Sequence, residues 1–276
     1  MTNVLRIAAF SAGNTGGNPA GVWLGPALPA DLEMQAMAKA VGFSETVFAT
    51  PFQSGQLVRY FSPEMEVPFC GHATIALGAA LAMRGGDGVF RLKLNDAEIT
   101  VEGRASNGTL SAALQSPPTR SQPAPPALVA QVLALFGYDP TELEATIPPA
   151  MMHAGADHLL VALKSRKALR AMVYDFDAGR QLMRQHGLVT ICLVHTESSQ
   201  RFHARNAFAA GGVLEDPATG AAAAAFGGYL RDIDWPHRGS IEIIQGEDMG
   251  MISRIQVQIP PAPGSSIRVS GAARVM

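Results

Sequence analysis

The sequence lacks several features that would assign a function class directly. Its 276 residues contain only two cysteines, Cys70 and Cys192, too few for a disulfide framework. Charged residues make up 16% of the chain, and 21 basic against 23 acidic residues leave no basic surplus for nucleic acid. There is no run of about 18 apolar residues, and the N-terminal residues do not resemble a signal peptide. We therefore expect a cytoplasmic protein with no membrane or nucleic-acid partner.

The common catalytic and cofactor motifs are also missing. No serine-triad pattern and no Walker loop is present. The glycine-rich turn Ser11–Gly21 leads into a strand, whereas a nucleotide-binding turn leads into a helix. Cys70 and His72 lie two residues apart, but no second pair stands at metal-ligand spacing. We expect neither a metal nor a cofactor.

The most distinctive stretch is Gly211–Leu230, which reads GGVLEDPATGAAAAAFGGYL and carries no charge after Asp216. A helix that is apolar all round belongs in a protein interior. Asp is favoured as an N-cap and Pro at the first helical position, so we expect this helix to start at Pro217 with Asp216 as its cap. Because the first amides of a helix have no partner within it, the helix start would offer a site for an anion.

An earlier segment, Arg59–Met83, repeats this pattern of a polar cluster followed by a charge-free Ala/Gly/Leu helix. Placing Cys70 over Asp216, which lies 146 residues later, also aligns the alanines of the two helices. A repeat at about half the chain length indicates two similar halves. Two such helix starts facing each other across a cleft would hold a carboxylate between them.

Two proline tracts are expected to separate these halves, because clustered prolines interrupt regular structure and often mark linkers. We expect linkers at residues 118–126 and 260–264. The N-terminal domain would then comprise residues 1–117 plus 265–276, and the C-terminal domain residues 127–259. In this division the last strand returns to the first domain.

The expected elements favour the α+β class, because strands outnumber helices and do not alternate strictly with them. We expect helices at about residues 31–41, 71–83, 128–136 and 166–172, another ending near 186, and the apolar helix after 217. Each half would be a sheet curled around one apolar helix.

Glu45 is the first candidate for the chemistry. A strand over Phe43–Thr50 would place Glu45 on one face with Phe43 and Val47. Desolvation on an apolar face disfavours the charged form of a carboxylate and suits it to proton transfer. If the strand is an edge strand or is bulged, Glu45 instead points to water.

The starts of the two apolar helices supply the other candidates. Cys70 is either a reactive thiolate at a helix start or a small buried hydrophobe. His72 lies in the first helical turn, where the helix dipole would hold it neutral. Capping alone, worth on the order of 1 kcal/mol, explains Asp216, and only its alignment with Cys70 favours a functional role.

Six motifs together resemble the PhzF family, named for phenazine biosynthesis. They are GNPAGV, GFSETVFAT, RYFSPEMEVPFCGHATIALGAAL, GADHLLV, GGVLEDPATGAAA and IIQGEDMG, in this order over nearly the whole chain. The resemblance implies a diaminopimelate epimerase-like fold. Such a fold has two pseudo-symmetric domains, each a curved sheet or barrel around a central helix, with the active site between them.

The resemblance also implies a reaction and a set of site residues. The reaction is a cofactor-independent isomerisation that moves a proton between carbons of a small, cyclic carboxylate. The implied catalytic residues are Glu45 as the proton shuttle, His72 and Asp216. The residues implied to contact the substrate are Asn18, Cys70, Gly71, Thr219 and Gly220.

The chain departs from the family pattern at two positions. Family members usually carry Ser where Ala221 stands and Arg where Met251 stands, so the ligand is expected to differ. Two alternatives stay open: a Cys70-dependent epimerase or racemase, and a PhzF-like binding protein without activity. Cys192 argues against the first, because it lies in an expected strand and not at the paired helix start. The high apolar content is compatible with a homodimer.

Overall fold

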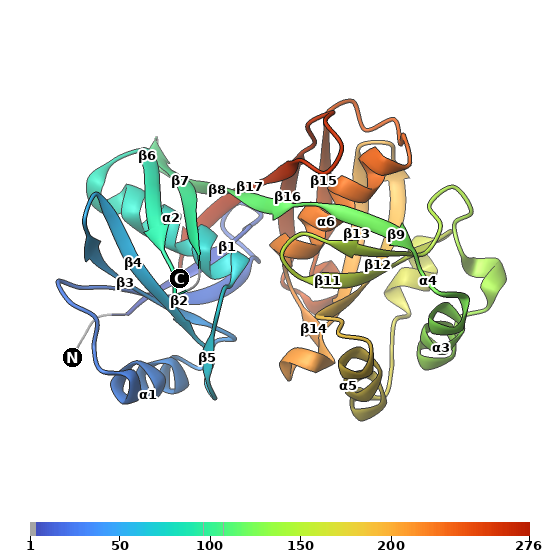
Figure 1. The fold of residues 1–276 in the computed structure, drawn as a ribbon, viewed down its shortest axis with the longest axis horizontal. Coiled ribbons are helices and arrows are strands. Elements are labelled where there is room, and N and C mark those ends of the chain that lie inside the picture. The colour runs from blue at the N-terminus through green and yellow to red at the C-terminus, as the bar shows by residue number, and fades with distance from the viewer. Residues whose placement is uncertain (1–3, 96, 107) are drawn as a thin grey trace. The chain divides into compact units, whose positions relative to one another are not determined.

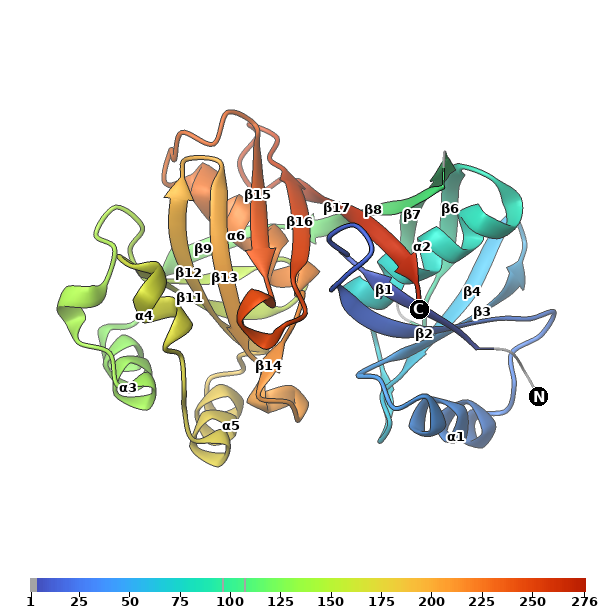
Figure 2. The same cartoon turned by 180° about the vertical axis from the view of Figure 1, so that it is seen from behind.

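The computed structural model describes residues 4–95, 97–106 and 108–276 of the chain. The chain divides into two units: unit 1 is Met1–Gln115 with Ser270–Met276, and unit 2 is Ser116–Val269. It passes from unit 1 to unit 2 within β8 (Thr109–Pro118) and returns within β17 (Ser266–Val275). Each unit wraps strands around one central helix, which confirms the predicted α+β class (Figures 1 and 2).

Unit 1 is a barrel around helix α2. Its elements before β8 are β1 (Leu5–Ala9), β2 (Asn18–Leu24), α1 (Asp31–Val41), β3 (Thr46–Phe52), β4 (Gly55–Phe61), β5 (Glu66–Val67), α2 (Gly71–Gly85), β6 (Gly88–Lys93) and β7 (Glu98–Ser106). Among the described residues, strand pairing runs β1–β2–β3–β4–β6–β7–β8–β17 and closes back onto β1. The short strand β5 adds to β4 alone.

Small residues let α2 lie close to the barrel wall. All residues from His72 to Ala82 are buried. A side chain at Gly103 of β7 would overlap the carbonyl oxygen of Gly78 on α2, so these two backbones approach as only glycine permits. Outside the barrel, Met34 and Ala38 of α1 pack against Trp23 and the neighbouring aromatic residues of β3 and β4.

Unit 2 holds helix α6 and a second layer of helices. Its elements before β17 are β9 (Arg120–Pro123), α3 (Pro126–Phe136), η1 (Pro140–Glu142), β10 (Ala150–His153), β11 (Asp157–Leu163), α4 (Arg166–Arg170), α5 (Phe176–Gln185), β12 (Thr190–Ser198), β13 (Arg201–Ala207), η2 (Ala209–Gly211), β14 (Glu215–Asp216), α6 (Gly220–Asp232), β15 (Ser240–Gln245), η3 (Glu247–Met249) and β16 (Ser253–Gln258). Strand pairing runs β9–β10–β11–β12–β13–β15–β16, and β14 adds to β13.

Alternate residues of β11 and β12 serve two cores in unit 2. Leu159 and Val161 belong to a cluster with Leu128, Leu169 and Met183, which come from α3, α4 and α5. The intervening residues of these strands face the other side of the sheet, as a period of two requires. Phe226 of α6 packs edge-on against Phe202 of β13, with ring centroids 4.9 Å apart.

The two units repeat one order of strand pairing, with β1–β2–β3–β4–β6–β7 matching β10–β11–β12–β13–β15–β16. The second and fourth pairs of each series, β2–β3 with β4–β6 and β11–β12 with β13–β15, are parallel. The predicted internal repeat is therefore confirmed.

The single offset of 146 residues holds only for part of this repeat. Tyr60 of β4 pairs with Val67 of β5 in the same way that Asn206 of β13 pairs with Asp216 of β14. Equivalent residues are therefore 146 positions apart in β4 and β13, but 149 positions apart in β5 and β14. The helix starts, Gly71 and Gly220, also differ by 149. The connection before β14 is three residues longer than the one before β5. The structural counterpart of Cys70 is consequently Thr219 and not Asp216.

Two predicted element starts are corrected by the structure. Helix α6 begins at Gly220 rather than Pro217, because Glu215 and Asp216 pair with β13 and Thr219 is the N-cap. Asp216 therefore does not cap the helix. Strand β3 begins at Thr46, so Glu45 lies just before it in the segment that follows α1.

The two proline tracts have structural roles other than the predicted ones. Residues 118–126 include β9, which pairs with β10, and Pro126 is the first residue of α3. Proline suits both places, because strand ends and first helical turns leave its missing N–H unneeded. Residues 260–264 lie between β16 and β17, on the unit 2 side of the division.

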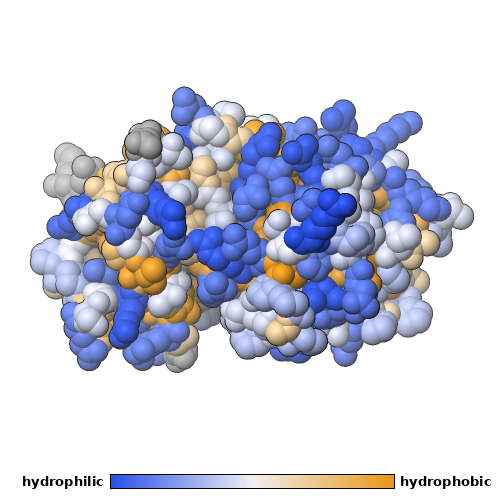
Figure 3. Space-filling model, turned by 90° about the horizontal axis from the view of Figure 1, so that it is seen from above, coloured by the Kyte–Doolittle hydropathy of each residue, from blue (hydrophilic) through white to orange (hydrophobic). Residues whose placement is uncertain are grey.

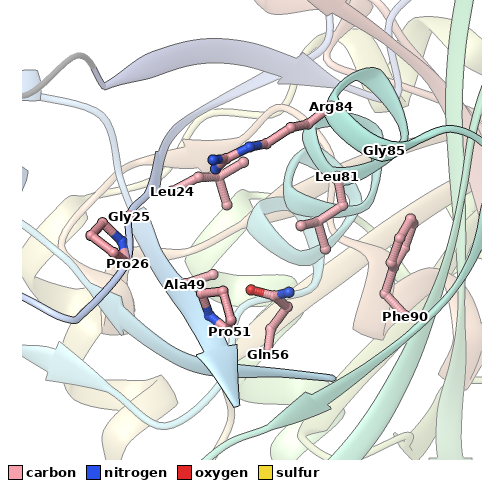
Figure 4. Close-up of a pocket in the computed structure, with 10 residues that line it drawn as sticks. All are labelled: Leu24, Gly25, Pro26, Ala49, Pro51, Gln56, Leu81, Arg84, Gly85 and Phe90. Atoms are coloured by element: carbon pink, nitrogen blue, oxygen red, sulfur yellow. The ribbon is translucent and has the colours of Figure 1, made fainter. Parts of the chain in front are cut away.

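No helix in the described part of the chain is long and apolar enough to cross a membrane. The face in Figure 3 is mostly hydrophilic, with scattered hydrophobic groups. A cavity of about 640 Å³ lies in unit 1 beside the C-terminal end of α2. Its walls include Leu81, Phe90 and Pro51, with Gln56 and Arg84 as polar members (Figure 4). None of the predicted site residues lines it.

Candidate active site

Unit 1 brings together three of the predicted residues: Glu45, Cys70 and His72. His72 Nε2 lies 3.4 Å from Glu45 Oε2, and its Nδ1 lies 3.3 Å from Cys70 Sγ. The side chains of His72 and Glu45 are 7% and 14% exposed. Ser44 adds a hydroxyl 3.4 Å from His72 Nε2. The cluster thus combines a carboxylate, an imidazole and a thiol in a largely dehydrated place.

The start of α2 positions Cys70 and His72. Cys70 is the N-cap residue in extended conformation, and Gly71 is the first residue of the helix. The carbonyl of Cys70 accepts the first helical hydrogen bond from Thr74 N–H and a second one, at 2.7 Å, from the Thr74 hydroxyl. Tyr60 contacts that hydroxyl in turn at 2.7 Å. This buried chain fixes the turn that carries the thiol and the imidazole.

Glu45 is held by its backbone at the entry to β3. Its carbonyl accepts a hydrogen bond of 3.1 Å from Gly21 N–H, which extends the parallel β2–β3 ladder by one step. The side chain then turns toward His72. The predicted alternation with Phe43 is wrong in detail, because Phe43 precedes the strand, yet the inference of a mostly buried Glu45 is confirmed.

Asn18 also lies in unit 1, as the first residue of β2. It is buried, and it stands opposite Ala9 of β1. The preceding Gly17 has φ of +84° and lies so close to the Ala9 carbonyl that a side chain there would collide with it. This tight turn places Asn18 at the end of its strand.

Glu45, Cys70 and His72 are also the described residues whose possible metal-ligand atoms all lie within 4.8 Å of one another. A single ion would have to contact the thiolate, the carboxylate and one of the two imidazole nitrogens at the same time. Here the thiol is nearest Nδ1 and the carboxylate is nearest Nε2. The arrangement fits a row of proton donors and acceptors better than a metal centre.

Unit 2 brings together Asp216, Thr219 and Gly220. The Thr219 hydroxyl donates a hydrogen bond of 2.6 Å to Asp216 Oδ2. Thr219 precedes Gly220 directly, and Gly220 opens α6. Asp216 is itself 6% exposed. Its carboxylate therefore lies against the side chain of the residue that precedes α6.

Gln245, at the end of β15, is a site residue that sequence reasoning missed. Its side-chain amide contacts both the Asp216 carbonyl and Thr219. The residue falls in the motif IIQGEDMG, but a glutamine after an apolar strand has many uses, and only the fold brings it to the start of α6. The backbone carbonyl of Met251, where the family usually has Arg, accepts a hydrogen bond from the Ser253 hydroxyl.

An arginine–glutamate pair holds the short strand before each helix, and it too was missed. In unit 1, Arg59 makes two hydrogen bonds of 2.7 and 2.6 Å to Glu66 of β5. In unit 2, Arg205 makes two of 3.0 and 2.5 Å to Glu215 of β14. The Arg59 contact holds the pKa of Glu66 below its usual value. Such two-pronged pairs fix geometry as well as charge.

Cys192 pairs across the sheet with Asn206, which pairs in turn with Asp216, so it lies two strands from that residue. It sits within β12, 3% exposed, and burial raises the pKa of its thiol to about 12. A thiol so far from ionisation at neutral pH is a packing residue, because the thiolate is the reactive form. The expectation that Cys192 lies in a strand is confirmed.

Comparison with known proteins adds to this geometry. The sequence profile of the PhzC-PhzF family, described as phenazine biosynthesis-like proteins, matches residues 7–276. A trans-2,3-dihydro-3-hydroxyanthranilate isomerase of Pseudomonas aeruginosa is 32% identical over 277 residues, which cover 98% of this chain and 94% of the relative. An uncharacterized isomerase of Deinococcus radiodurans is 30% identical over 272 residues, covering 94% and 87% of the two chains.

Solved structures show the same fold at lower sequence identity. A PhzF-family phenazine biosynthesis protein of Bacillus anthracis matches with a TM-score of 0.87 at 21% identity, covering 99% of this chain and 96% of that one. A probable proline racemase of Agrobacterium radiobacter matches with a TM-score of 0.68 at 10% identity, covering 99% and 90%. The predicted diaminopimelate epimerase-like fold is therefore confirmed.

Proposed function

Because the chain belongs to the PhzC-PhzF family, whose relatives are named isomerases, we propose that it catalyses a cofactor-independent proton shift within a small cyclic carboxylate. Glu45 is the general acid and base. It removes a proton from one carbon and returns it to another, so that the substrate is isomerised and the enzyme is unchanged. The carbon acid named in the relatives, trans-2,3-dihydro-3-hydroxyanthranilate, is the first substrate to test.

The observation that carries this proposal is the distance of 3.4 Å between Glu45 Oε2 and His72 Nε2 in a mostly buried place. Nε2 faces the Glu45 carboxylate and also contacts the Ser44 hydroxyl at 3.4 Å; with its proton on Nε2, the imidazole presents a donor to this side, and Nδ1 is left to accept the Cys70 S–H. His72 thereby orients the Glu45 side chain before proton removal. Contacts of this length in a ligand-free site are expected to tighten when substrate binds.

The second set of roles falls to unit 2. Asp216 is the remaining catalytic residue of the proposal, and Thr219 and Gly220 contact the substrate through the start of α6. The supporting features are the burial of Asp216 and its hydrogen bond with the Thr219 hydroxyl. In unit 1, Asn18, Cys70 and Gly71 serve as substrate contacts. Ala221 lacks the hydroxyl that the resemblance would place in the first turn of α6, so the substrate is expected to make one polar contact fewer there.

A Cys70-dependent epimerisation is the competing proposal, and the contact between Cys70 Sγ and His72 Nδ1 favours it. Such a reaction uses a second thiol on the opposite face of the substrate. The counterpart of Cys70 in unit 2 is Thr219, and Cys192 is buried within a strand. The single thiol therefore favours the glutamate mechanism. A PhzF-like binding protein without activity is the remaining alternative.

Replacing Glu45 with Gln tests the proposal. The variant keeps the shape of the side chain but cannot exchange a proton, so turnover should fall by about 10³-fold. The assay follows isomerisation of trans-2,3-dihydro-3-hydroxyanthranilate in D₂O, with deuterium incorporation read by mass spectrometry. Glu64→Gln, at an exposed position nearby, is the matched control. Full activity of Glu45→Gln would exclude the mechanism, and lack of deuterium incorporation by the unmodified protein would favour a silent binding protein.

A further inference from the structure

Gln245 makes three hydrogen bonds at the start of α6. Its Oε1 accepts from Thr219 N–H at 3.2 Å. Its Nε2 donates to the Asp216 carbonyl at 2.7 Å and to Thr219 Oγ1 at 3.0 Å. The residue is 1% exposed, so these contacts are made away from water. One buried amide thus joins the residue that precedes the helix to the strand that carries Asp216.

The backbone dictates which way this amide faces. A backbone N–H only donates and a carbonyl only accepts, so Oε1 must face Thr219 N–H and Nε2 must face the Asp216 carbonyl. Nε2 also only donates, so the Thr219 hydroxyl must accept from it. The single hydroxyl hydrogen of Thr219 is then directed to Asp216 Oδ2, 2.6 Å away. Gln245 consequently sets the direction of the hydrogen bond that reaches the Asp216 carboxylate.

Unit 1 has no such amide at the corresponding place. Lys93 of β6 pairs with Leu57 in the same way that Ile244 of β15 pairs with His203. The residue after Lys93 is Leu94 and the residue after Ile244 is Gln245, so Leu94 corresponds to Gln245. Leu94 is 3% exposed and offers no polar side chain. The equivalent turn in unit 1 is held instead by Thr74 and Tyr60. The buried amide is therefore a feature of unit 2 that the equivalent position of unit 1 does without.

We propose that Gln245 is a positioning residue that holds the Asp216 carboxylate and the first turn of α6 in the geometry required for the reaction. It acts through Thr219 and does not touch the substrate. This proposal rests on the proposed function for the role of Asp216, whereas the fixing of the turn itself does not.

Two variants separate positioning from mere packing. Gln245→Leu fills the space without hydrogen bonds. Gln245→Glu replaces the amide donor by a carboxyl group, which donates only when it is protonated. The neutral acid can donate again to the Asp216 carbonyl oxygen, whereas the carboxylate repels that oxygen. Gln245→Glu should therefore regain activity as pH is lowered, and Gln245→Leu should not. Thr119→Val is the control, because it removes buried hydrogen bonds at the other end of α6, where Arg231 donates to Thr119 at 2.7 Å.

The experiment measures kcat and KM for trans-2,3-dihydro-3-hydroxyanthranilate across pH and, separately, the hydrogen exchange of the Thr219 amide by NMR. We expect Gln245→Leu to lower kcat by about 100-fold, with faster Thr219 exchange, and Thr119→Val to change neither by more than about threefold. Relative to the unmodified enzyme at the same pH, Gln245→Glu should follow Gln245→Leu at neutral pH and recover at least tenfold in kcat at acid pH.

Two results would overturn the proposal: unchanged Thr219 exchange in Gln245→Leu, or a kcat within about threefold of the unmodified enzyme. If the unmodified protein does not turn over this acid, the proposed function fails. In that case the exchange measurement still decides whether Gln245 holds the turn.

Discussion

The two units place different chemistry on the same framework. Both wrap strands around a helix rich in small residues, and both hold the strand before that helix with an arginine–glutamate pair. The titratable cluster of unit 1 has no copy in unit 2. Cys70 corresponds to Thr219 and His72 to Ala221, by the shared offset of the helix starts.

The position of Glu45, the proposed proton shuttle, shows the same contrast. Thr46 pairs with Phe61 as Ile191 pairs with Ala207, so Glu45 in unit 1 corresponds to Thr190 in unit 2. Thr190 is fully buried and bonded to His158 and Asn206, and it has no acid to offer. Among the described residues the cluster of Glu45, Cys70 and His72 is therefore not duplicated at the equivalent positions of unit 2, and this asymmetry favours the proposed single shuttle over a symmetric pair.

The converse holds at the positions where unit 2 is polar. Val67 corresponds to Asp216 and Leu94 to Gln245. A repeat can therefore be read from the fold while the functional residues of its halves differ at nearly every equivalent place. The comparison teaches that strand pairing, and not residue identity, reveals which positions correspond.

The sharpest way to break the comparison is to remove the carboxylate of Asp216. Asp216→Asn keeps the shape and can still accept from the Thr219 hydroxyl, so folding should be nearly unchanged. In the catalytic role proposed for Asp216, loss of the carboxylate should lower kcat/KM by about 10³-fold, or about 4 kcal/mol. Steady-state kinetics measure this loss. Asp177→Asn, which changes an exposed side chain of α5, is the control. Activity within tenfold of the unmodified enzyme would remove Asp216 from the mechanism.

A second comparison sets the two arginine–glutamate pairs against each other. The Glu215 side chain is 4% exposed, and Arg205 also donates to the carbonyl of Arg170 at 2.9 Å. Glu66 is 29% exposed and keeps a hydrogen bond from Asn95. Arg205→Met should therefore lower the free energy of unfolding by about 4 kcal/mol, and Arg59→Met by only about 1 kcal/mol. Urea unfolding measures both, and equal losses would contradict the ranking by burial.

The buried histidine of unit 2 predicts a dependence of stability on pH. Burial lowers the pKa of His158 from 6.5 to about 4, against a smaller opposite effect of Asp157. Below about pH 6.5 the unfolded chain binds a proton that the folded chain refuses, so the free energy of unfolding should fall as pH falls. The loss should reach about 3 kcal/mol near pH 4.

His158→Gln should flatten this part of the curve, because a neutral amide can still bond to Thr190. Urea unfolding between pH 7 and 4 measures the slope, and His186→Gln is the control on a less buried histidine. An equally steep fall in His158→Gln would assign the acid sensitivity to other groups.

The smallest effect is expected at the thiol. Cys70→Ser keeps a polar hydrogen near His72 Nδ1, and the glutamate mechanism does not use the sulfur for bond making. Activity should change by less than about threefold. Alkylation of Cys70 should lower activity only because the added group occupies space beside His72. A loss comparable to that of Glu45→Gln would revive the thiol-dependent epimerisation.

Much of the framework could be predicted because it rests on local signals. Helix α1 spans the expected Asp31–Val41, and Gly42 ends it in the left-handed conformation. The start of α6 could not be predicted in the same way. Asp-Pro is a favourable local start, but the pairing of Glu215 and Asp216 with β13 keeps the chain extended until Gly220.

The site shows the same division between local and distant causes. Glu45, Cys70 and His72 stand in motifs, and the fold brings them together. Gln245 reaches the start of α6, and Arg205 reaches Glu215 of β14, only through the pairing of β13 with β14 and β15. Contacts between segments so far apart in the sequence depend on the whole topology, which no local pattern contains.

The course of β17 bears on how the chain is made. Ile7 of β1 pairs with Val275, so the first strand and the last lie in one sheet. On a translating ribosome, the barrel of unit 1 therefore stays open until β17 has been synthesised, whereas most of unit 2 already has its partners. Unit 1 would depend longer on protection from aggregation, and removal of Ser270–Met276 should unfold it, because these residues belong to unit 1.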